Sequence, residues 1–258
     1  MTMTRDELRE HLVRARIAGS VSTPRASNVG NIRKMLDRDP DYWFGVELDR
    51  DWTSDEVLAV MAQRVGIDAD PSRETGADSL DPDRCLDALD LVADVLAKLV
   101  VGGGRVLIAT GHPTGLLAML MTVAESLGAA GITVMTPSAE SWVGVNGEQR
   151  RIRYLGRVAT IGTGGDLLHT HSPEPMQAIL AGLDRRGEPR PDLVIADHGW
   201  AGAASQAGIP TVGFADTNDP ALFVAAAQDR PITVVPLDDN VAPASYDAVA
   251  DYLLHRVL

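Results

Sequence analysis

Cysteine and long hydrophobic runs are scarce in this chain of 258 residues. Cys85 is the single cysteine, which excludes an intrachain disulfide and predicts a reducing, cytoplasmic location. Cys85 falls among the apolar positions of a helical pattern, so we expect a buried thiol rather than a nucleophile. No run of about 18 uncharged apolar residues occurs, and the N-terminal stretch lacks the apolar segment of a signal peptide. We therefore expect no membrane span.

Basic residues are also few. The chain has 23 Lys and Arg against 36 Asp and Glu, a formal charge of −13. Such a surface repels the phosphates of nucleic acids and of anionic membranes, so we expect neither as a partner. A hydrophobic content of 45% is ample for the core of one α/β domain, with or without an added arm. The sequence leaves open whether the chain forms a homo-oligomer.

A polar loop, DPSRETGADSLDPD, divides the chain near residue 80. Before it, Thr4 followed by Glu7 is a capping-box pattern that predicts a helix over 4–18, and VSTPRASNVGNIRKML leads into a second short helix. The aromatic residues, only 4% of the chain, concentrate in DPDYWFGVELDRDW, which predicts a packing cluster over one end of the core. We therefore predict an N-terminal helical arm over 1–80, packed on an α/β domain over 81–258.

After residue 80, short apolar runs alternate with helical patterns. The expected strands cover 105–110, 131–136, 157–162, 166–171, 192–197, 211–216 and 232–237. The expected helices cover 81–99, 114–128, 173–185, 200–207, 219–228 and 244–257. Apolar strands between helices predict a three-layer, Rossmann-like α/β fold with a mostly parallel sheet. Asn146-Gly147, between two alternating segments, predicts an inserted β-hairpin with a type I′ turn.

Five of these predicted strands end in polar clusters. Ligands of open α/β sheets bind outside the carboxyl ends of the strands, so we expect the five clusters to share one edge. Of the six histidines in the chain, four fall there, which scattered surface histidines would not do. They are His112, His169, His171 and His198.

The cluster from Gly111 to Gly115 opens a helix directly after a strand. Free backbone N–H groups and the positive end of the helix dipole suit a phosphate at such a turn, so we predict that Gly111, Thr114 and Gly115 bind one. The spacing matches neither the dinucleotide fingerprint nor the P-loop, and an ordinary β–α turn also requires glycine. His112 is placed to donate to a substrate oxygen or to act as an acid.

His169 and His171 are two residues apart on a predicted strand, so both side chains should point to one face. A metal, a bound anion or a carboxylate partner would explain two crowded imidazoles, and a solvated strand end is the alternative. Ser172 and Pro173 predict the start of the next helix, as its N-cap and first residue.

Aspartates follow the last three strands. Strand alternation lets one residue of Asp197-His198 face the site, and we favour Asp197, with His198 close behind. Asp216 is the freer carboxylate of its cluster, because Asn218 or Asp219 is expected to cap the next helix. The run Asp-Asp-Asn after the last strand is equally well explained as a turn.

Together these clusters offer imidazoles, carboxylates and amides but no thiol. This set suits a divalent cation such as Mg²⁺, Mn²⁺ or Zn²⁺, and we predict His169, His171 and Asp197 as its ligands. The cation could polarise a phosphoryl oxygen or generate hydroxide from water. Alternatively, the histidines and aspartates do acid–base work directly. We predict no organic cofactor.

The motifs ATGHPTGLL, LHTHSPEPM, ADHGWAGAA, ADTNDPALF and VPLDDNV, with RIAGSVSTPRASN near the start, resemble an actinobacterial family labelled phosphatase. The resemblance covers most of the chain. It implies a reaction that needs an anion cradle, neutralisation of phosphate charge, and a nucleophile. Arg25, Arg33 and Lys34 are candidates for charge neutralisation if the arm folds over the strand edge, and we assign Arg25 to phosphate binding.

The resemblance and the residues together predict a phosphatase that hydrolyses a small phosphorylated metabolite. His112 or His198 would protonate the leaving oxygen. Water is the preferred nucleophile, with direct attack by Asp197 or Asp216 as the other route. Two alternatives stay open: a non-catalytic module that binds a nucleotide or phosphorylated ligand, and a metal-free lyase or isomerase.

Overall fold

A nine-stranded sheet forms the middle of the computed structural model, which describes residues 3–138 and 141–258. Its strands are β3 (Arg105–Ala109), β4 (Thr133–Val134), β5 (Trp142–Val145), β6 (Glu148–Leu155), β7 (Val158–Thr163), β8 (Asp166–Leu168), β9 (Leu193–Asp197), β10 (Thr211–Ala215) and β11 (Ile232–Pro236). The spatial order is β11-β10-β9-β3-β7-β6-β5, with β4 also beside β3 and β8 also beside β7. All pairs that involve β3, β9, β10 and β11 are parallel, which confirms the predicted sheet.

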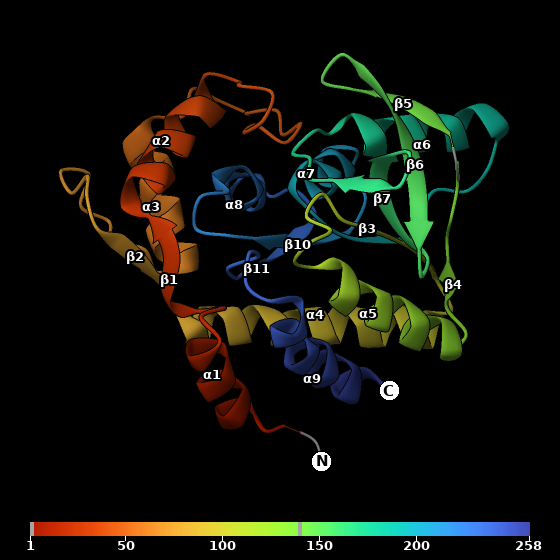
Figure 1. Ribbon diagram of the computed structural model, residues 1–258, viewed down its shortest axis with the longest axis horizontal. Helices are drawn as coiled ribbons and strands as arrows, with labels where there is room; N and C mark the ends of the chain where they lie inside the picture. Colours follow the sequence, from red (N-terminus) through yellow and green to blue (C-terminus); the bar gives the residue numbers. More distant parts are fainter. Residues whose placement is uncertain (1–2, 139–140) are drawn as a thin grey trace.

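Helices cover both faces of this sheet and give the three layers that the sequence predicts (Figure 1). One face carries α4 (Pro82–Gly102), α5 (Leu117–Ala129) and α9 (Asp247–Val257), which follows a 3-10 turn at Pro243–Tyr246. The other face carries α6 (Glu174–Arg186), α7 (His198–Gln206) and α8 (Pro220–Ala227). Cys85 is buried in α4 as predicted, and burial raises the pKa of its thiol to about 12. Among the described residues, no helix is long and apolar enough to cross a membrane.

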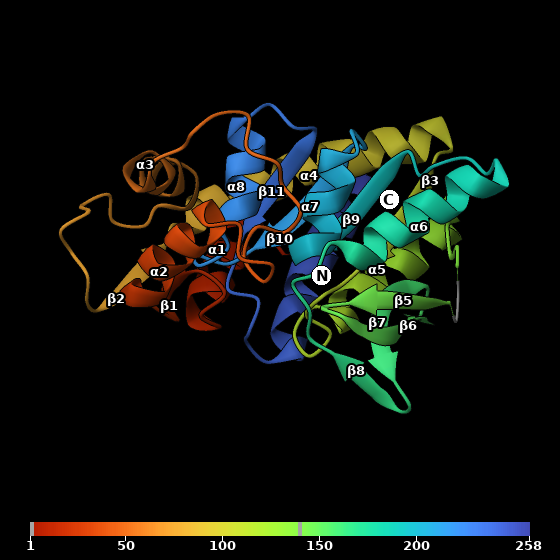
Figure 2. The ribbon, with the colours of Figure 1, turned by 90° about the horizontal axis from the view of Figure 1, so that it is seen from above.

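The N-terminal segment contains more than the predicted helices. It holds α1 (Arg5–Arg14), α2 (Arg25–Leu36), α3 (Ser54–Val65), and an antiparallel sheet of β1 (Gly19–Pro24) and β2 (Ala77–Leu80). Thr4 and Glu7 form the predicted capping box, whereas the sequence predicts neither α3 nor this sheet. Helix α1 packs on α4, and α2 and α3 pack on α8, so the segment lies against the α/β layers (Figure 2). The division at residue 80 stays a prediction.

Two hairpins extend the sheet at β7. β5 and β6 form the predicted type I′ hairpin, in which Asn146 and Gly147 have φ of 49° and 79°. β7 runs past the end of β3, and β8 turns back along it, with Leu168 opposite Ile161. The chain therefore returns toward the carboxyl edge of the parallel strands at His169.

Candidate active site

The carboxyl ends of β3, β9, β10 and β11 and the segment after β8 open onto one cavity of about 310 Å³. The arm lines it too. Its lining residues are Ser22, Thr23, Pro24, Ser27, His112, His169, His171, His198, Asp216, Asn218, Asp219, Asp238, Asp239 and Asn240. The structure thus brings together all four histidines noted at the predicted strand ends.

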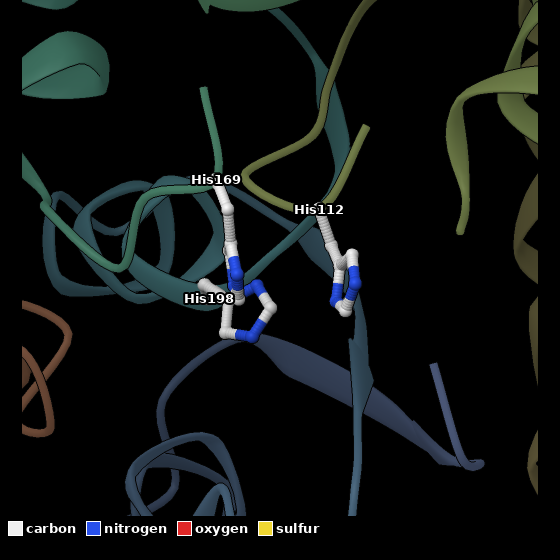
Figure 3. Close-up of side chains that lie close together, drawn as sticks. All are labelled: His112, His169 and His198. Atoms are coloured by element: carbon white, nitrogen blue, oxygen red, sulfur yellow. The ribbon is translucent and has the colours of Figure 1, made fainter. Parts of the chain in front are cut away.

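These histidines pack ring against ring. The rings of His112 and His169 stack with centroids 4.4 Å apart, and those of His171 and His198 stack at the same separation. Figure 3 shows His112, His169 and His198 reaching toward one another from separate segments. Phe44, from the predicted aromatic cluster, lies edge-on to His171 and His198 at 5.3 Å. This residue of the aromatic cluster therefore packs against the site.

The pair His169 and His171 lies in a loop, which corrects the predicted strand over 166–171. β8 ends at Leu168 because the N–H of Thr170 donates to the carbonyl of Gly111 rather than to a strand partner. His171 Nδ1 lies 2.6 Å from the carbonyl of Asp41, so this nitrogen donates and Nε2 keeps its lone pair. That lone pair faces His169 Nε2 at 3.0 Å.

Both imidazoles of this pair are neutral near pH 7. Desolvation, followed by the charge of His198, lowers the pKa of His169 to about 4 and that of His171 to about 3. Neutral imidazoles are the form that binds metals. The next helix begins at Glu174, one residue later than predicted, and its N-cap is Pro173 rather than Ser172.

His198 lies at the centre of the polar contacts. It begins α7 with φ of 44°, a left-handed conformation that a non-glycine residue adopts at an energetic cost. Its Nδ1 lies 2.9 Å from Asp197 Oδ1, and its Nε2 lies 3.6 Å and 3.5 Å from Asp219 and Asp239. Burial lowers the pKa of His198, but the carboxylates of Asp219, Asp197 and Asp239 together raise it to about 10.

Asp197 does not line the cavity, which argues against its predicted role as a metal ligand. Its Oδ1 accepts hydrogen bonds from the Gly111 N–H at 2.6 Å and from His198, and its Oδ2 accepts one from the Thr110 hydroxyl. The carboxylate is fully buried and occupied by these donors. Asp197 therefore fixes the ring of His198, and His198 is the residue of the pair that faces the cavity.

Four buried carboxylates also line the cavity: Asp216, Asp219, Asp238 and Asp239. Burial, followed by the charges of Asp239 and Asp238, raises the pKa of Asp216 well above its ordinary value. Burial raises the pKa of Asp219 to about 6, against the opposing effect of His198. Carboxylates crowded in a buried space favour a bound cation.

Asp219, Asp238 and Asp239 are not among the predicted site residues, because a helix cap and a turn account for them in the sequence. Asp219 is the N-cap of α8 by position, but its side chain accepts the N–H of Asp216 instead of capping the helix. Asp238 does accept the Asn240 N–H in a turn, yet it also lines the cavity. Two adjacent carboxylates at the end of a parallel strand were the available signal.

The arm contributes hydroxyl groups to the site. The Thr23 hydroxyl donates to Asp216 Oδ2 at 2.6 Å, and the Thr217 N–H donates to Asp216 Oδ1 at 2.6 Å. Ser22 and Ser27 also line the cavity. Sequence patterns do not predict these contacts, because they join segments almost 200 residues apart.

The structure does not show the predicted phosphate cradle. The Gly111 N–H donates to Asp197, the Gly115 N–H donates to the carbonyl of His112, and Thr114 is exposed outside the cavity lining. Helix α5 begins only at Leu117. The glycines serve packing instead. A Cβ on Gly111 would lie 2.2 Å from the Thr170 carbonyl oxygen, and one on Gly115 would meet a backbone carbonyl at 2.1 Å.

Arg25 is fully buried and is not among the residues that line the cavity, so no contact among the described residues supports its predicted role in binding phosphate. Its guanidinium pairs with Asp78 at 3.1 Å and donates to the carbonyls of Asp68, Asp70 and Arg73. All of these partners lie within the N-terminal segment. Of the other two candidate cations, Lys34 lies over the ring of Tyr42, and neither Lys34 nor Arg33 lines the cavity.

Replacing Arg25 with methionine is expected to lower the free energy of unfolding by about 3 kcal/mol. The reason is that the buried carboxylate of Asp78 loses its ion pair with the Arg25 guanidinium. Urea denaturation measures this change. The exposed pair of Arg190 and Asp184 provides the control. Arg190→Met should change stability by less than about 1 kcal/mol. Equal effects of the two variants would contradict a structural role for Arg25.

Comparison with known proteins bears on the class of reaction. The model of the Phosphatase family matches residues 3–258. The chain belongs to the Phosphatase family. It is also 47% identical to Phosphatase SCO2771 of Streptomyces coelicolor over 255 aligned residues. The alignment covers 98% of this chain and 96% of that protein. These findings confirm the resemblance inferred from the motifs.

Proposed function

We propose that this chain hydrolyses the phosphomonoester of a small metabolite, assisted by a divalent cation in the cavity. One observation carries the proposal: the described lining residues include four carboxylates and four imidazoles but no lysine or arginine. Four carboxylates repel an anionic phosphate, so a cation is needed for the substrate to enter. Membership of the Phosphatase family supports the class of reaction.

The residues present fit such a cation. His198, Asp219 and Asp239 each offer a ligand atom, and these atoms lie within 4.8 Å of one another. A mixed set of imidazole and carboxylate ligands suits Mn²⁺, Fe²⁺ or Zn²⁺. Asp197 holds Nδ1 of His198, which leaves Nε2 facing the cavity, where a divalent cation would replace its proton. Ligating histidines commonly have a carboxylate partner of this kind. In the proposal, His198, Asp219 and Asp239 therefore replace the ligands predicted from the sequence, which were His169, His171 and Asp197.

A bound divalent cation would polarise a phosphoryl oxygen and lower the pKa of a water molecule in the cavity. Water is the nucleophile in this proposal, because a divalent cation in the cavity would lower its pKa. His112 is the proposed acid for the leaving oxygen. Burial lowers its pKa, but Asp239, 3.2 Å away, raises it above the ordinary value of histidine. His112 can therefore hold a proton near neutral pH.

Removing the metal is expected to abolish phosphatase activity. Protein treated with a chelator and dialysed should not hydrolyse p-nitrophenyl phosphate above the blank, and added Mg²⁺, Mn²⁺ or Zn²⁺ should restore turnover. Unchanged activity in verified metal-free protein would favour metal-free acid–base chemistry instead. Binding of phosphorylated ligands without turnover, with every metal tested, would favour a non-catalytic binding module.

A further inference from the structure

The ligand atoms at the cavity form three overlapping groups rather than one. The groups are His112, His169 and His198; His198, Asp219 and Asp239; and Asp216, Asp238 and Asp239. Within each group the atoms lie within 4.8 Å of one another. Among the described residues, no group within this limit contains both a member of the histidine group and Asp216 or Asp238. The set is therefore more extended than the ligands of one cation.

The shared residues decide how many cations the groups can hold. His198 belongs to the first two groups, but its Nδ1 is hydrogen-bonded to Asp197, so only its Nε2 is available to bind a cation. One ring nitrogen binds one cation, so only one of these two groups can be occupied at a time, and the group with Asp219 and Asp239 leaves His112 as the proposed acid. Asp239 joins the second and third groups, and a carboxylate has two oxygens that can bind different cations. The second and third groups therefore describe two positions.

A second observation concerns Asp239, whose carboxylate faces two imidazoles without a well-aligned hydrogen bond to either. Its side chain is buried, with 5% of the residue exposed, and it lines the cavity. Within the described part of the chain, Asp239 Oδ2 accepts no hydrogen bond, although His112 Nδ1 and His198 Nε2 lie 3.2 Å and 3.5 Å away. His112 Nδ1 is likewise buried without a hydrogen bond. Buried polar atoms normally have a partner, and a bound cation would supply one to Asp239.

We infer that the cavity holds two divalent cations bridged by the carboxylate of Asp239. The nitrogen-rich position lies at His198 and Asp219, and the oxygen-rich position lies at Asp216 and Asp238. Paired cations about 3.5–4 Å apart are known to clamp the attacking and leaving oxygens of a phosphoryl group. This role in catalysis rests on the proposed function, whereas the binding of two cations can be tested without substrate.

The two positions differ in ligand chemistry, which guides the choice of probe. Imidazole with carboxylate suits Zn²⁺, Fe²⁺ or Mn²⁺, whereas carboxylates alone suit Mg²⁺ or Mn²⁺. Mn²⁺ suits both positions and is paramagnetic. It therefore reports both the number of bound ions and their proximity.

The experiment titrates metal-free protein with Mn²⁺, and measures bound metal by equilibrium dialysis and coupling by electron paramagnetic resonance. We expect about two equivalents per chain and the spectrum of an exchange-coupled pair. Asp216→Asn and Asp238→Asn should each retain about one equivalent of Mn²⁺ and give an uncoupled spectrum, because the nitrogen-rich position at His198 and Asp219 stays intact. Asp251→Asn, at an exposed position of α9, should behave like the unchanged protein.

The outcomes separate this inference from the proposed function. One equivalent at saturation, or two equivalents without coupling, would overturn the bridged pair. If that protein still hydrolyses p-nitrophenyl phosphate with Mn²⁺, the proposed function survives. No bound Mn²⁺, together with turnover independent of metal, would overturn both. Circular dichroism of the two variants confirms that any loss of Mn²⁺ comes from a folded protein.

Discussion

Replacing His198 with alanine is expected to lower kcat/KM for p-nitrophenyl phosphate by more than about 100-fold, beyond the range typical of a residue that only orients a metal ligand. Nε2 of His198 faces both Asp219 and Asp239, and belongs to two of the three candidate groups of metal ligands. Without this imidazole, the nitrogen-rich position loses its central ligand. Steady-state kinetics at saturating Mn²⁺ measure the effect.

The control for this variant is His255→Ala, at an exposed histidine near the end of α9. It should keep the activity of the unchanged protein. His198→Ala keeps the left-handed backbone at this residue, whose φ is 44°, so circular dichroism is used to check that the variant is folded. Loss of activity in a folded His198→Ala protein therefore points to chemistry rather than to unfolding. Full activity of that variant would exclude His198 from the site.

Asp197→Asn is expected to weaken activation by metal about 10- to 100-fold while leaving most of kcat at saturating metal. Asp197 contacts the ring of His198 but does not line the cavity, so its effect must pass through that ring. An asparagine keeps the shape of the side chain but loses the charge, and one of its two side-chain atoms no longer accepts. The ring of His198 is then held less firmly for the cation.

The measurement is the Mn²⁺ concentration needed for half-maximal activity, taken separately from kcat. Asp192→Asn is the matched control, because Asp192 directly precedes the same strand, β9, and pairs with Arg105 at the surface. That control should leave the activation constant unchanged. A loss of kcat that no metal concentration restores would show that Asp197 acts in the reaction itself.

The location of the site could be predicted from the sequence, because it depends on a general property of parallel sheets. Apolar strands followed by polar residues specify which edge of the sheet carries the ligands. His112 lies three residues after the end of β3, His198 directly follows β9, and both line the cavity. The fold follows from the same pattern of alternating apolar runs and amphipathic helices.

The roles within the site depend on features that the sequence pattern does not display. Strand alternation favoured Asp197 over His198, but the chain reverses at His198 with a positive φ and turns the imidazole into the cavity. A glycine-rich turn was interpreted as a phosphate cradle. Its glycines instead leave room for backbone carbonyls of Thr170 and Asp239, which lie about 60 and 120 residues away along the chain.

Arg25 illustrates the same limit for charged residues. An arginine that binds substrate and an arginine in a buried ion pair look alike in sequence, because the role of the arginine depends on the residue that it contacts. Here the partner is Asp78, which is brought to Arg25 by the pairing of β1 with β2. That sheet joins segments more than 50 residues apart, and neither segment has a strong strand pattern.

Crystals of the protein grown with Mn²⁺ and measured for anomalous scattering test the central claim most directly. We expect anomalous density in the cavity within about 2.0–2.4 Å of His198 Nε2 and of a carboxylate oxygen of Asp219 or Asp239. A cavity without anomalous density at saturating Mn²⁺, with His198 still paired directly to these carboxylates, would contradict it.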